Sequence, residues 1–183
     1  MKSNYSIPGL VTINTDAGYL PYRNLGAYAY WIKGENIFLK GSGLFKENLR
    51  SAREAEVKAI VNALHVLGKE EIKIVKLIIN RDNIKATADV SGDYLHRLLH
   101  KAIEALKSLR GTPYFSYEFR HVPAHQKSTD KKRFVNNWCD EQCTAQLTPY
   151  KLSRAKGNTY KNHKSNLNYN KLLQARKKSK SLK

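Results

Sequence analysis

The chain has few of the residues that stabilise secreted domains. Only two of its 183 residues are cysteines, Cys139 and Cys143. Two cysteines cannot form a disulfide framework, and a zinc site would need a second pair of ligands. Spaced four apart in a segment with helical periodicity, they are expected to share one helix face as free thiols. Residues 1–20 show no basic segment followed by an apolar one, so we predict no secretory signal and a cytoplasmic location.

Long apolar segments are also missing. No run of roughly 18 apolar residues occurs, so no transmembrane helix is expected. Hydrophobic residues nevertheless make up 41% of the chain and aromatic residues 10%. This content is enough for one folded domain of ordinary size plus an appendage. Residues 164–183 contain few apolar side chains besides four leucines, which argues against binding to a membrane surface.

Acidic residues are scarce. The chain has 15 Asp and Glu against 33 Lys and Arg, and its net charge is +18. Residues 147–183 hold eleven of the basic residues and no acid, which leaves +7 on the rest. We therefore predict a folded domain at residues 1–147 and a basic, flexible tail at residues 148–183. This charge favours nucleic acid as the partner, although a tail that only aids solubility or localisation is an alternative. No oligomeric state is predicted.

The periodicity of apolar residues changes along the chain from strand-like to helix-like. Alternating or continuous β-branched runs predict strands, and apolar residues spaced three or four apart predict helices. Strands are expected at residues 9–16, 25–32, 36–45, 72–79 and 114–122, and helices at residues 51–67, 94–109 and 134–147. This order predicts an α/β fold with a mixed five-stranded sheet, in which three antiparallel strands precede alternating helices and strands, and helices cover both faces.

Four acidic residues lie at informative positions in these elements. Asp16 is expected at the end of the first strand, Glu56 in the first turns of the first helix, Asp82 after the fourth strand and Asp140 in the last helix. Each has a structural explanation when taken alone, because carboxylates cap turns and complement the dipole of a helix N-terminus. Glu56 is preferred to Glu54 because the alanine and leucine spacing of the helix follows Glu56.

The segments around these acids form a set of motifs in a fixed order. Together they resemble the type 1 ribonuclease H family over roughly residues 8–146, and that family has the same order of strands and helices. The matching segments are Thr-Asp-Ala-Gly at 15–18, Glu-x-x-Ala-x-x-x-Ala-Leu at 56–64, Ile-Ile-Asn-Arg-Asp-Asn at 78–83, His-Val-Pro-Ala-His at 121–125 and Val-Asn-Asn-Trp-Cys-Asp-Glu at 135–141.

The resemblance implies a metal-dependent endonuclease that hydrolyses the RNA strand of RNA–DNA hybrids by a two-metal mechanism. Two Mg²⁺ ions, which Mn²⁺ can replace, would be held by four carboxylates. A histidine would assist proton transfer or product release, whereas a loop histidine without a catalytic role is the alternative. The implied catalytic residues are Asp16, Glu56, Asp82, Asp140 and His125.

Several polar residues near these motifs are candidate contacts to nucleic acid. Arg53 stands where the family commonly has Asn or Gln, and a guanidinium can hold a phosphate but accepts no hydrogen bond from a 2′-hydroxyl. The segment from His125 to Asp140 is longer than the family usually has, and its polar loop at residues 126–133 either binds substrate phosphate or is merely solvated. The candidate contacts are Arg53, Asn83, Lys127, Lys131, Lys132 and Arg133.

Two alternative functions stay open on the sequence. One is a catalytically silent ribonuclease H-like component that binds nucleic acid within a larger assembly, which the basic tail and Arg53 favour. The other is a related nuclease with a different substrate. The exonuclease branch typically begins with Asp-x-Glu, and Gly18 in the third position of this pattern argues against it.

Overall fold

The structure, a computed structural model, describes residues 8–81, 93–122 and 131–151. Residues 152–183 lie outside the described residues, so the domain boundary after residue 147 stays a prediction. The elements in chain order are β1 (Leu10–Leu20), a 3-10 turn (Pro21–Arg23), β2 (Leu25–Gly34), β3 (Phe38–Leu44), α1 (Ala52–Gly68), β4 (Ile74–Arg81), α2 (Tyr94–Arg110), β5 (Gly111–His121), α3 (Lys131–Leu147) and a second 3-10 turn (Thr148–Tyr150).

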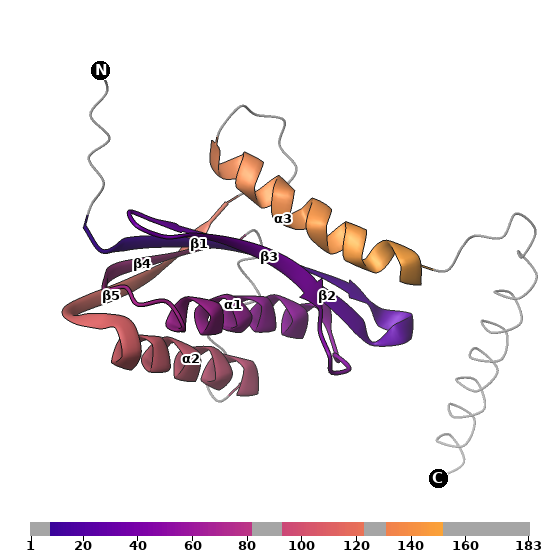
Figure 1. Cartoon of the computed structure of the whole chain (residues 1–183). Helices are drawn as coiled ribbons and strands as arrows, with labels where there is room; N and C mark the ends of the chain where they lie inside the picture. Colours follow the sequence, from indigo (N-terminus) through magenta and orange to yellow (C-terminus); the bar gives the residue numbers. More distant parts are fainter. Residues whose placement is uncertain (1–7, 82–92, 123–130, 152–183) are drawn as a thin grey trace, which may run out of the picture. The chain divides into compact units, whose positions relative to one another are not determined.

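The five strands form one mixed sheet in the order β3-β2-β1-β4-β5. β1 pairs antiparallel with β2, and β2 with β3, whereas β4 runs parallel to both β1 and β5. Figure 1 shows α3 on one face of the sheet and α1 and α2 on the other. The predicted fold class, including helices on both faces, is therefore confirmed.

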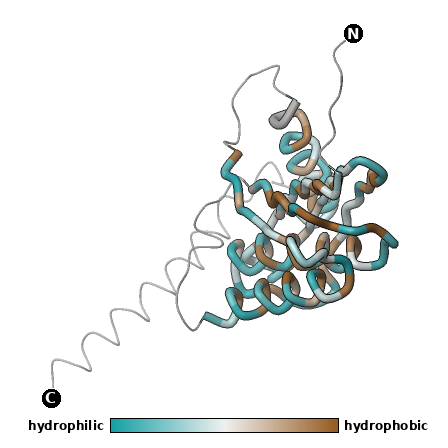
Figure 2. Tube along the Cα trace, turned by 90° about the vertical axis from the view of Figure 1, so that its left-hand side faces the viewer, coloured by the Kyte–Doolittle hydropathy of each residue, from teal (hydrophilic) through white to brown (hydrophobic). Residues whose placement is uncertain are grey.

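Side chains of β1 alternate between the two faces of the sheet, as the pleat of a strand requires. Val11 and Ile13 are buried in the core together with Ile60 of α1. Leu20 lies instead in the cluster that contains Cys143 of α3. The even-numbered residues of β1 therefore face α3. Figure 2 shows the hydrophobic strands in the middle of the molecule and helices that alternate between hydrophilic and hydrophobic colours.

Helix α1 begins where the sequence indicates. Ser51 is its N-cap, and the Ser51 side chain accepts a hydrogen bond from the Glu54 N–H. Near its start the helix packs Ala55 and Ala59 with Tyr19 of β1. Since residues 60–67 of the helix pack with the beginning of β1, α1 runs antiparallel to β1. The first turns of α1 therefore lie beside the second half of β1.

The first strand is longer than predicted, so Asp16 lies within β1 and not at its end. Pairing with β2 continues to Leu20, which lies opposite Leu25. Pairing of the described residues with β4 already ends where Asn14 meets Asn80. Within the described residues, the antiparallel pairing of β1 therefore extends six residues further than the parallel pairing, and the sequence pattern of β1 alone carries no sign of this.

The last helix also begins earlier than predicted. Lys131, Lys132 and Arg133 form the first turn of α3 and do not belong to a loop. Lysine and arginine are good helix formers, and packing of the buried face of α3 outweighs the unfavourable dipole at its start. Cys139 and Cys143 are free and buried on one face, as expected. No helix among the described residues is long and apolar enough to cross a membrane.

Candidate active site

Asp16 is a buried carboxylate in a central strand. Only 5% of the residue is exposed. Its Oδ1 accepts a hydrogen bond from the Ala17 N–H at 2.8 Å, which orients the carboxylate. As an even-numbered residue of β1 it projects toward α3. A buried carboxylate is costly unless hydrogen bonds or positive charge compensate it, so this position is a candidate for cation binding.

Two thiols of α3 fix that helix against β1. The Cys143 Sγ donates to the backbone oxygen of Asp16 at 3.3 Å, and the Cys139 Sγ to that of Asn14 at 3.9 Å. Each step of four residues along α3 therefore matches a step of two along β1, and the two elements run in the same direction. A Cβ on Gly18 would lie 2.5 Å from Leu147, so this close approach continues to the end of the helix.

The Cys143 thiol is buried in an environment with negative charge around it. Burial raises the pKa of this thiol, and the negative charges of Asp16 and Glu56 raise it further. The thiol thus stays protonated at neutral pH and acts as a hydrogen-bond donor, not as a nucleophile. The charges that act on this sulfur thus come from Asp16 of β1 and Glu56 of α1, in the region where the first turns of α1 lie beside the second half of β1.

The position of Glu56 on α1 explains how it reaches this region. Glu56 shares a helical stripe with Ile60, Ala63 and Leu67, which are all buried against the sheet. Glu56 itself is half-buried. It therefore starts from the sheet-facing side of α1, in the turns that lie beside the second half of β1.

Asp140 lies on one flank of α3. On the other flank, Trp138 packs against Trp31 of β2, and the Gln146 side chain donates to Ser42 of β3 at 3.3 Å. Asp140 is about 100° around the helix from the buried Cys139, on the side away from Trp138. It is exposed and lies on the flank directed toward β4.

A buried pair of asparagines, which was not predicted from the sequence, joins β1 to β4. The Asn80 Nδ2 donates to the Asn14 Oδ1 at 2.9 Å, and neither residue is more than 5% exposed. The sequence feature that could have predicted this pair is a polar residue inside each of two otherwise apolar strands. In the sequence, Asp16 follows Asn14 by two residues, just as Asp82 follows Asn80.

The structure brings some of the predicted site residues together and does not describe others. Asp16 and Glu56 converge, and Asp140 lies on the flank of α3 that faces the same side. Within residues 8–81, 93–122 and 131–151, no three His, Cys, Asp or Glu residues form a group that could hold a metal ion. The side chains of Lys131, Lys132 and Arg133 are not described, and the predictions that lie outside the described residues are Asp82, Asn83, His125 and Lys127.

The chain is similar to known proteins in its structure, whereas the comparisons of its sequence find no match. No family model and no curated protein sequence matches the chain. Ribonuclease H1 from the archaeon Halobacterium salinarum is 17% identical with a TM-score of 0.57, over 77% of this chain and 99% of that one. LC11-RNase H1, solved with an RNA/DNA hybrid, is 18% identical with a TM-score of 0.57, over 76% and 98%.

A third similar structure is the N-terminal ribonuclease H domain of a Mycobacterium tuberculosis protein, solved as a fusion with maltose-binding protein. It is 15% identical with a TM-score of 0.54, over 76% of this chain and 94% of that one. The chain has a ribonuclease H fold. At these identities the likeness establishes the fold and leaves the activity to be argued from the residues.

In this ribonuclease H fold, Glu54 serves the start of α1. Its Oε2 accepts from the Arg50 N–H at 2.7 Å while its own N–H donates to Ser51. Its carboxylate also lies 3.0 Å from the Lys58 ammonium, which is 3.0 Å from Glu47 as well. Glu54 is thus part of a reciprocal helix cap and an ion-pair network, which distinguishes it from the neighbouring Glu56.

We expect Glu54→Gln to lower stability in a pH-dependent way. Burial favours the protonated carboxyl, but the Arg50 N–H and Lys58 outweigh this, so the pKa of Glu54 is lowered. The stabilisation is therefore present above the ordinary pKa of a glutamate and is lost as pH falls through the lowered value. The variant should lose about 1 kcal/mol at pH 7, measured by urea unfolding, and the difference should shrink below about pH 4.

The control for this prediction is Glu104→Gln. Glu104 pairs with Lys107 on the exposed side of α2 at 3.7 Å, and both side chains are more than half exposed. Surface ion pairs of this kind contribute little to the free energy of unfolding. This variant should therefore unfold like the parent protein both at pH 7 and below about pH 4. An equal loss in the two variants, or a Glu54→Gln effect that does not change with pH, would contradict the assigned role of Glu54.

Arg53 connects the first two helices. It forms an ion pair with Asp93, and the Asp93 side chain also accepts from the Leu95 N–H at 3.1 Å as the N-cap of α2. The Leu95 N–H, and after it Arg53, hold the pKa of Asp93 below its usual value. Arg53 therefore already has an anionic partner within the fold, which the sequence reading did not foresee.

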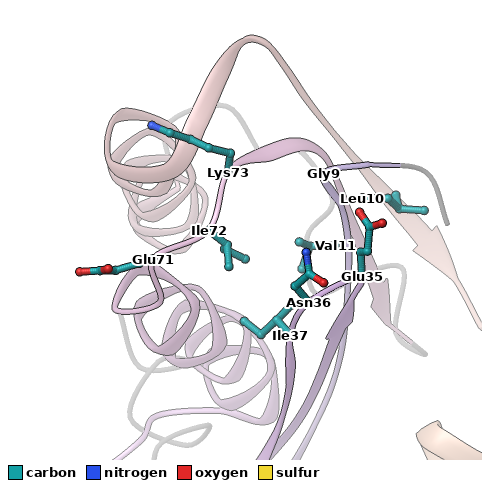
Figure 3. A pocket seen from close by; sticks show the side chains of 9 residues that line it. All are labelled: Gly9, Leu10, Val11, Glu35, Asn36, Ile37, Glu71, Ile72 and Lys73. Carbon is teal, nitrogen blue, oxygen red and sulfur yellow. The ribbon is translucent and has the colours of Figure 1, made fainter.

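One pocket among the described residues lies away from these carboxylates. It has a volume of about 310 Å³ and is lined by the start of β1, the turn between β2 and β3, and the segment before β4. Figure 3 shows Val11, Ile37 and Ile72 pointing into it, whereas Glu71 points away. Its charged groups do not converge, and it lies at the end of β1 opposite to the end that carries Asp16.

Proposed function

We propose that the protein is a metal-dependent nuclease of the ribonuclease H type that hydrolyses the RNA strand of RNA–DNA hybrids. The observation that carries the proposal is the convergence of Asp16 and Glu56. Asp16 is 5% exposed, it lies beside the buried bond between Asn14 and Asn80, and Glu56 belongs to the turns of α1 that lie beside the same half of β1. Two carboxylates supplied by neighbouring elements offer the oxygen ligands that a divalent cation prefers.

The residues fit Mg²⁺ by their chemistry. Carboxylate oxygens are the ligands that this ion prefers, and the nearby thiols are protonated and buried, so they do not compete for it. In the proposal, Asp82 and Asp140 complete the set with Asp16 and Glu56. When bound, two such ions supply an activated water and stabilise the charge on the leaving oxygen, and Mn²⁺ can replace them.

The contribution of the chain itself is to hold these groups in place. The Ala17 N–H orients the Asp16 carboxylate, and the hydrogen bond from Cys143 to the backbone of Asp16 keeps α3, and with it Asp140, at a fixed register. Such preorganisation lowers the cost of assembling the reactive geometry. His125 is proposed to pass a proton to the leaving group, because its ordinary pKa lies near neutral pH.

The proposed substrate follows from charge and from one of the similar structures. A net charge of +18 attracts a polyanion, and LC11-RNase H1 was solved with an RNA/DNA hybrid. Arg53 is the weakest of the proposed contacts since its guanidinium pairs with Asp93. The remaining proposed contacts to the phosphate backbone are Asn83, Lys127, Lys131, Lys132 and Arg133.

The proposal is tested by cleavage of labelled RNA–DNA hybrid, double-stranded RNA, duplex DNA and single strands, each with Mg²⁺, Mn²⁺ or a chelator. We expect cutting of the RNA strand of the hybrid alone, lost with chelator and in Asp82→Asn. Metal-dependent cutting of another substrate would indicate a different nuclease on the same fold. Binding without any cutting would indicate a silent nucleic-acid-binding component of a larger assembly, and would overturn the proposal.

A further inference from the structure

A cluster of aromatic side chains lies on the α3 face of the sheet, on the flank of α3 opposite to Asp140. Its centre is Trp31 of β2, which contacts three other rings edge to face. The ring centroids lie 5.0 Å away for Phe38 of β3, 5.3 Å for Trp138 and 6.3 Å for Phe134 of α3. We call Trp31, Phe38, Phe134 and Trp138 the aromatic cluster.

The cluster is open to solvent on its outer side. Phe38 is 54% exposed and Phe134 is 64% exposed, although each contacts Trp31. Single exposed apolar side chains are common, but adjoining ones indicate a binding surface, and Phe38 and Phe134 contact the same ring. The inner members, Trp31 and Trp138, pack against buried residues between α3 and the sheet, among them Ala29 and Cys139. The inner rings therefore hold the outer ones in place with much of their surface accessible.

Positive charge accompanies the exposed rings. The Lys40 ammonium lies 5.4 Å from the Trp31 ring centroid and 5.3 Å from that of Trp138, so two cation–π contacts hold it among the aromatic rings. Lys33 is exposed and lies two residues beyond Trp31, on the same face of β2. The first turn of α3, which directly precedes Phe134, is Lys131, Lys132 and Arg133.

This combination of groups matches single-stranded nucleic acid. Every base has a flat face that can stack on an exposed aromatic ring, and every phosphate needs a cation close to the stacked base. A protein partner would need apolar surface but not the cations Lys33 and Lys40 beside it. On the surface of α3, the acidic residue near the cluster is Glu141, one turn beyond Trp138.

We propose that the aromatic cluster binds single-stranded nucleic acid, with bases stacked on Phe38 and Phe134 and a phosphate on Lys40. This site is separate from the carboxylates, because Trp138 and Asp140 lie on opposite flanks of α3. It needs no metal ion, and it does not depend on the proposed nuclease activity. Its function is to hold an unpaired DNA or RNA strand while another part of the surface contacts the duplex.

The chain contains a convenient probe, because both of its tryptophans belong to the aromatic cluster. Tryptophan fluorescence therefore reports on this site alone. We expect thymidine or uridine oligomers of roughly 12 nucleotides to quench it in the presence of a chelator. Phe134→Ala should weaken this binding about tenfold, as expected for the loss of one stacked base. Comparison of the two oligomers shows whether DNA or RNA binds better.

Three matched variants make the result specific. Tyr114→Ala removes an aromatic ring of β5 that is 83% exposed and lies outside the cluster, so it should not change the affinity. Lys40→Gln should weaken binding and reduce its dependence on salt, which a purely structural role of Lys40 would not do. Asp16→Asn should bind like the parent protein, so failure of the nuclease proposal would leave this result intact.

Two outcomes would overturn the assignment. One is an unchanged affinity in Phe134→Ala, with folding verified by circular dichroism. The other is sedimentation that shows reversible association of the chain, abolished by Phe134→Ala, with no quenching by either oligomer. That second result would identify the cluster as an interface between two copies of the protein.

Discussion

Asp16→Asn is expected to lower the rate of hybrid cleavage by about a thousandfold or more, which corresponds to at least ~4 kcal/mol of transition-state stabilisation. The substitution keeps the shape of the side chain, and the amide oxygen can still accept from the Ala17 N–H. What it removes is the negative charge that binds a divalent cation. The measurement is single-turnover cleavage at saturating Mg²⁺, which separates the chemical step from product release.

The same variant should not lose stability in the absence of metal. Asp16 is only 5% exposed, and a neutral amide costs less free energy to bury than a carboxylate. Its melting temperature in chelator should therefore equal or exceed that of the parent protein. Mg²⁺ should raise the melting temperature of the parent protein but not of Asp16→Asn, because a ligand stabilises only the state that binds it.

Glu54→Gln is the control for this experiment, since Glu54 serves the helix cap and the Lys58 ion pair. Its cleavage rate per folded molecule should be unchanged at pH 7. Full cleavage by Asp16→Asn, or an equal loss of rate in both variants, would show that Asp16 does not hold a catalytic cation.

Ile79→Ala should have the largest effect on stability. Ile79 is fully buried in β4, opposite Ile13 of β1 and Phe119 of β5. Removal of its outer carbons leaves a cavity in the centre of the sheet, and such substitutions cost about 2–5 kcal/mol. For a domain of this size the melting temperature should fall by about 5–15 °C. Denaturant unfolding with an unchanged m-value would show that the native state itself is destabilised.

The matched control is Ile72→Ala, just before β4. Ile72 is only partly buried and packs at the margin of the same core, so the same change of side chain should cost much less. Equal losses in the two variants would mean that burial at Ile79 does not determine the effect. Below its melting temperature, Ile79→Ala should cleave at nearly the parental rate, because Ile79 faces α1 whereas Asn80 faces α3.

Together the two predictions assign different tasks to alternate residues of neighbouring strands. In β1 and β4 the residues that face α1 build the core, as Ile13 and Ile79 do. The residues that face α3 carry the polar groups, as Asn14, Asp16 and Asn80 do. Stability and activity should therefore respond separately to substitutions one residue apart, because successive side chains of a strand point to opposite faces.

The sequence by itself determined the order and type of the elements. The stripe of Ile60, Ala63 and Leu67 predicted α1, and the change from alternating to helical periodicity predicted the mixed sheet. These patterns are local, since the pleat of a strand and the turn of a helix are properties of neighbouring residues. The four acids could be named as candidates for the same reason, because their positions relative to the local pattern are visible in the chain.

Only the tertiary structure decided which residues meet. The pairing of β1 with β2 continued to Leu20 and placed Asp16 inside a strand, two residues beyond the bond from Asn80 to Asn14. Packing between helices paired Arg53 with Asp93, and packing of α3 on β2 gathered both tryptophans around Lys40. Such contacts join residues far apart in the chain, and their geometry depends on strand register and helix packing, which no local periodicity contains.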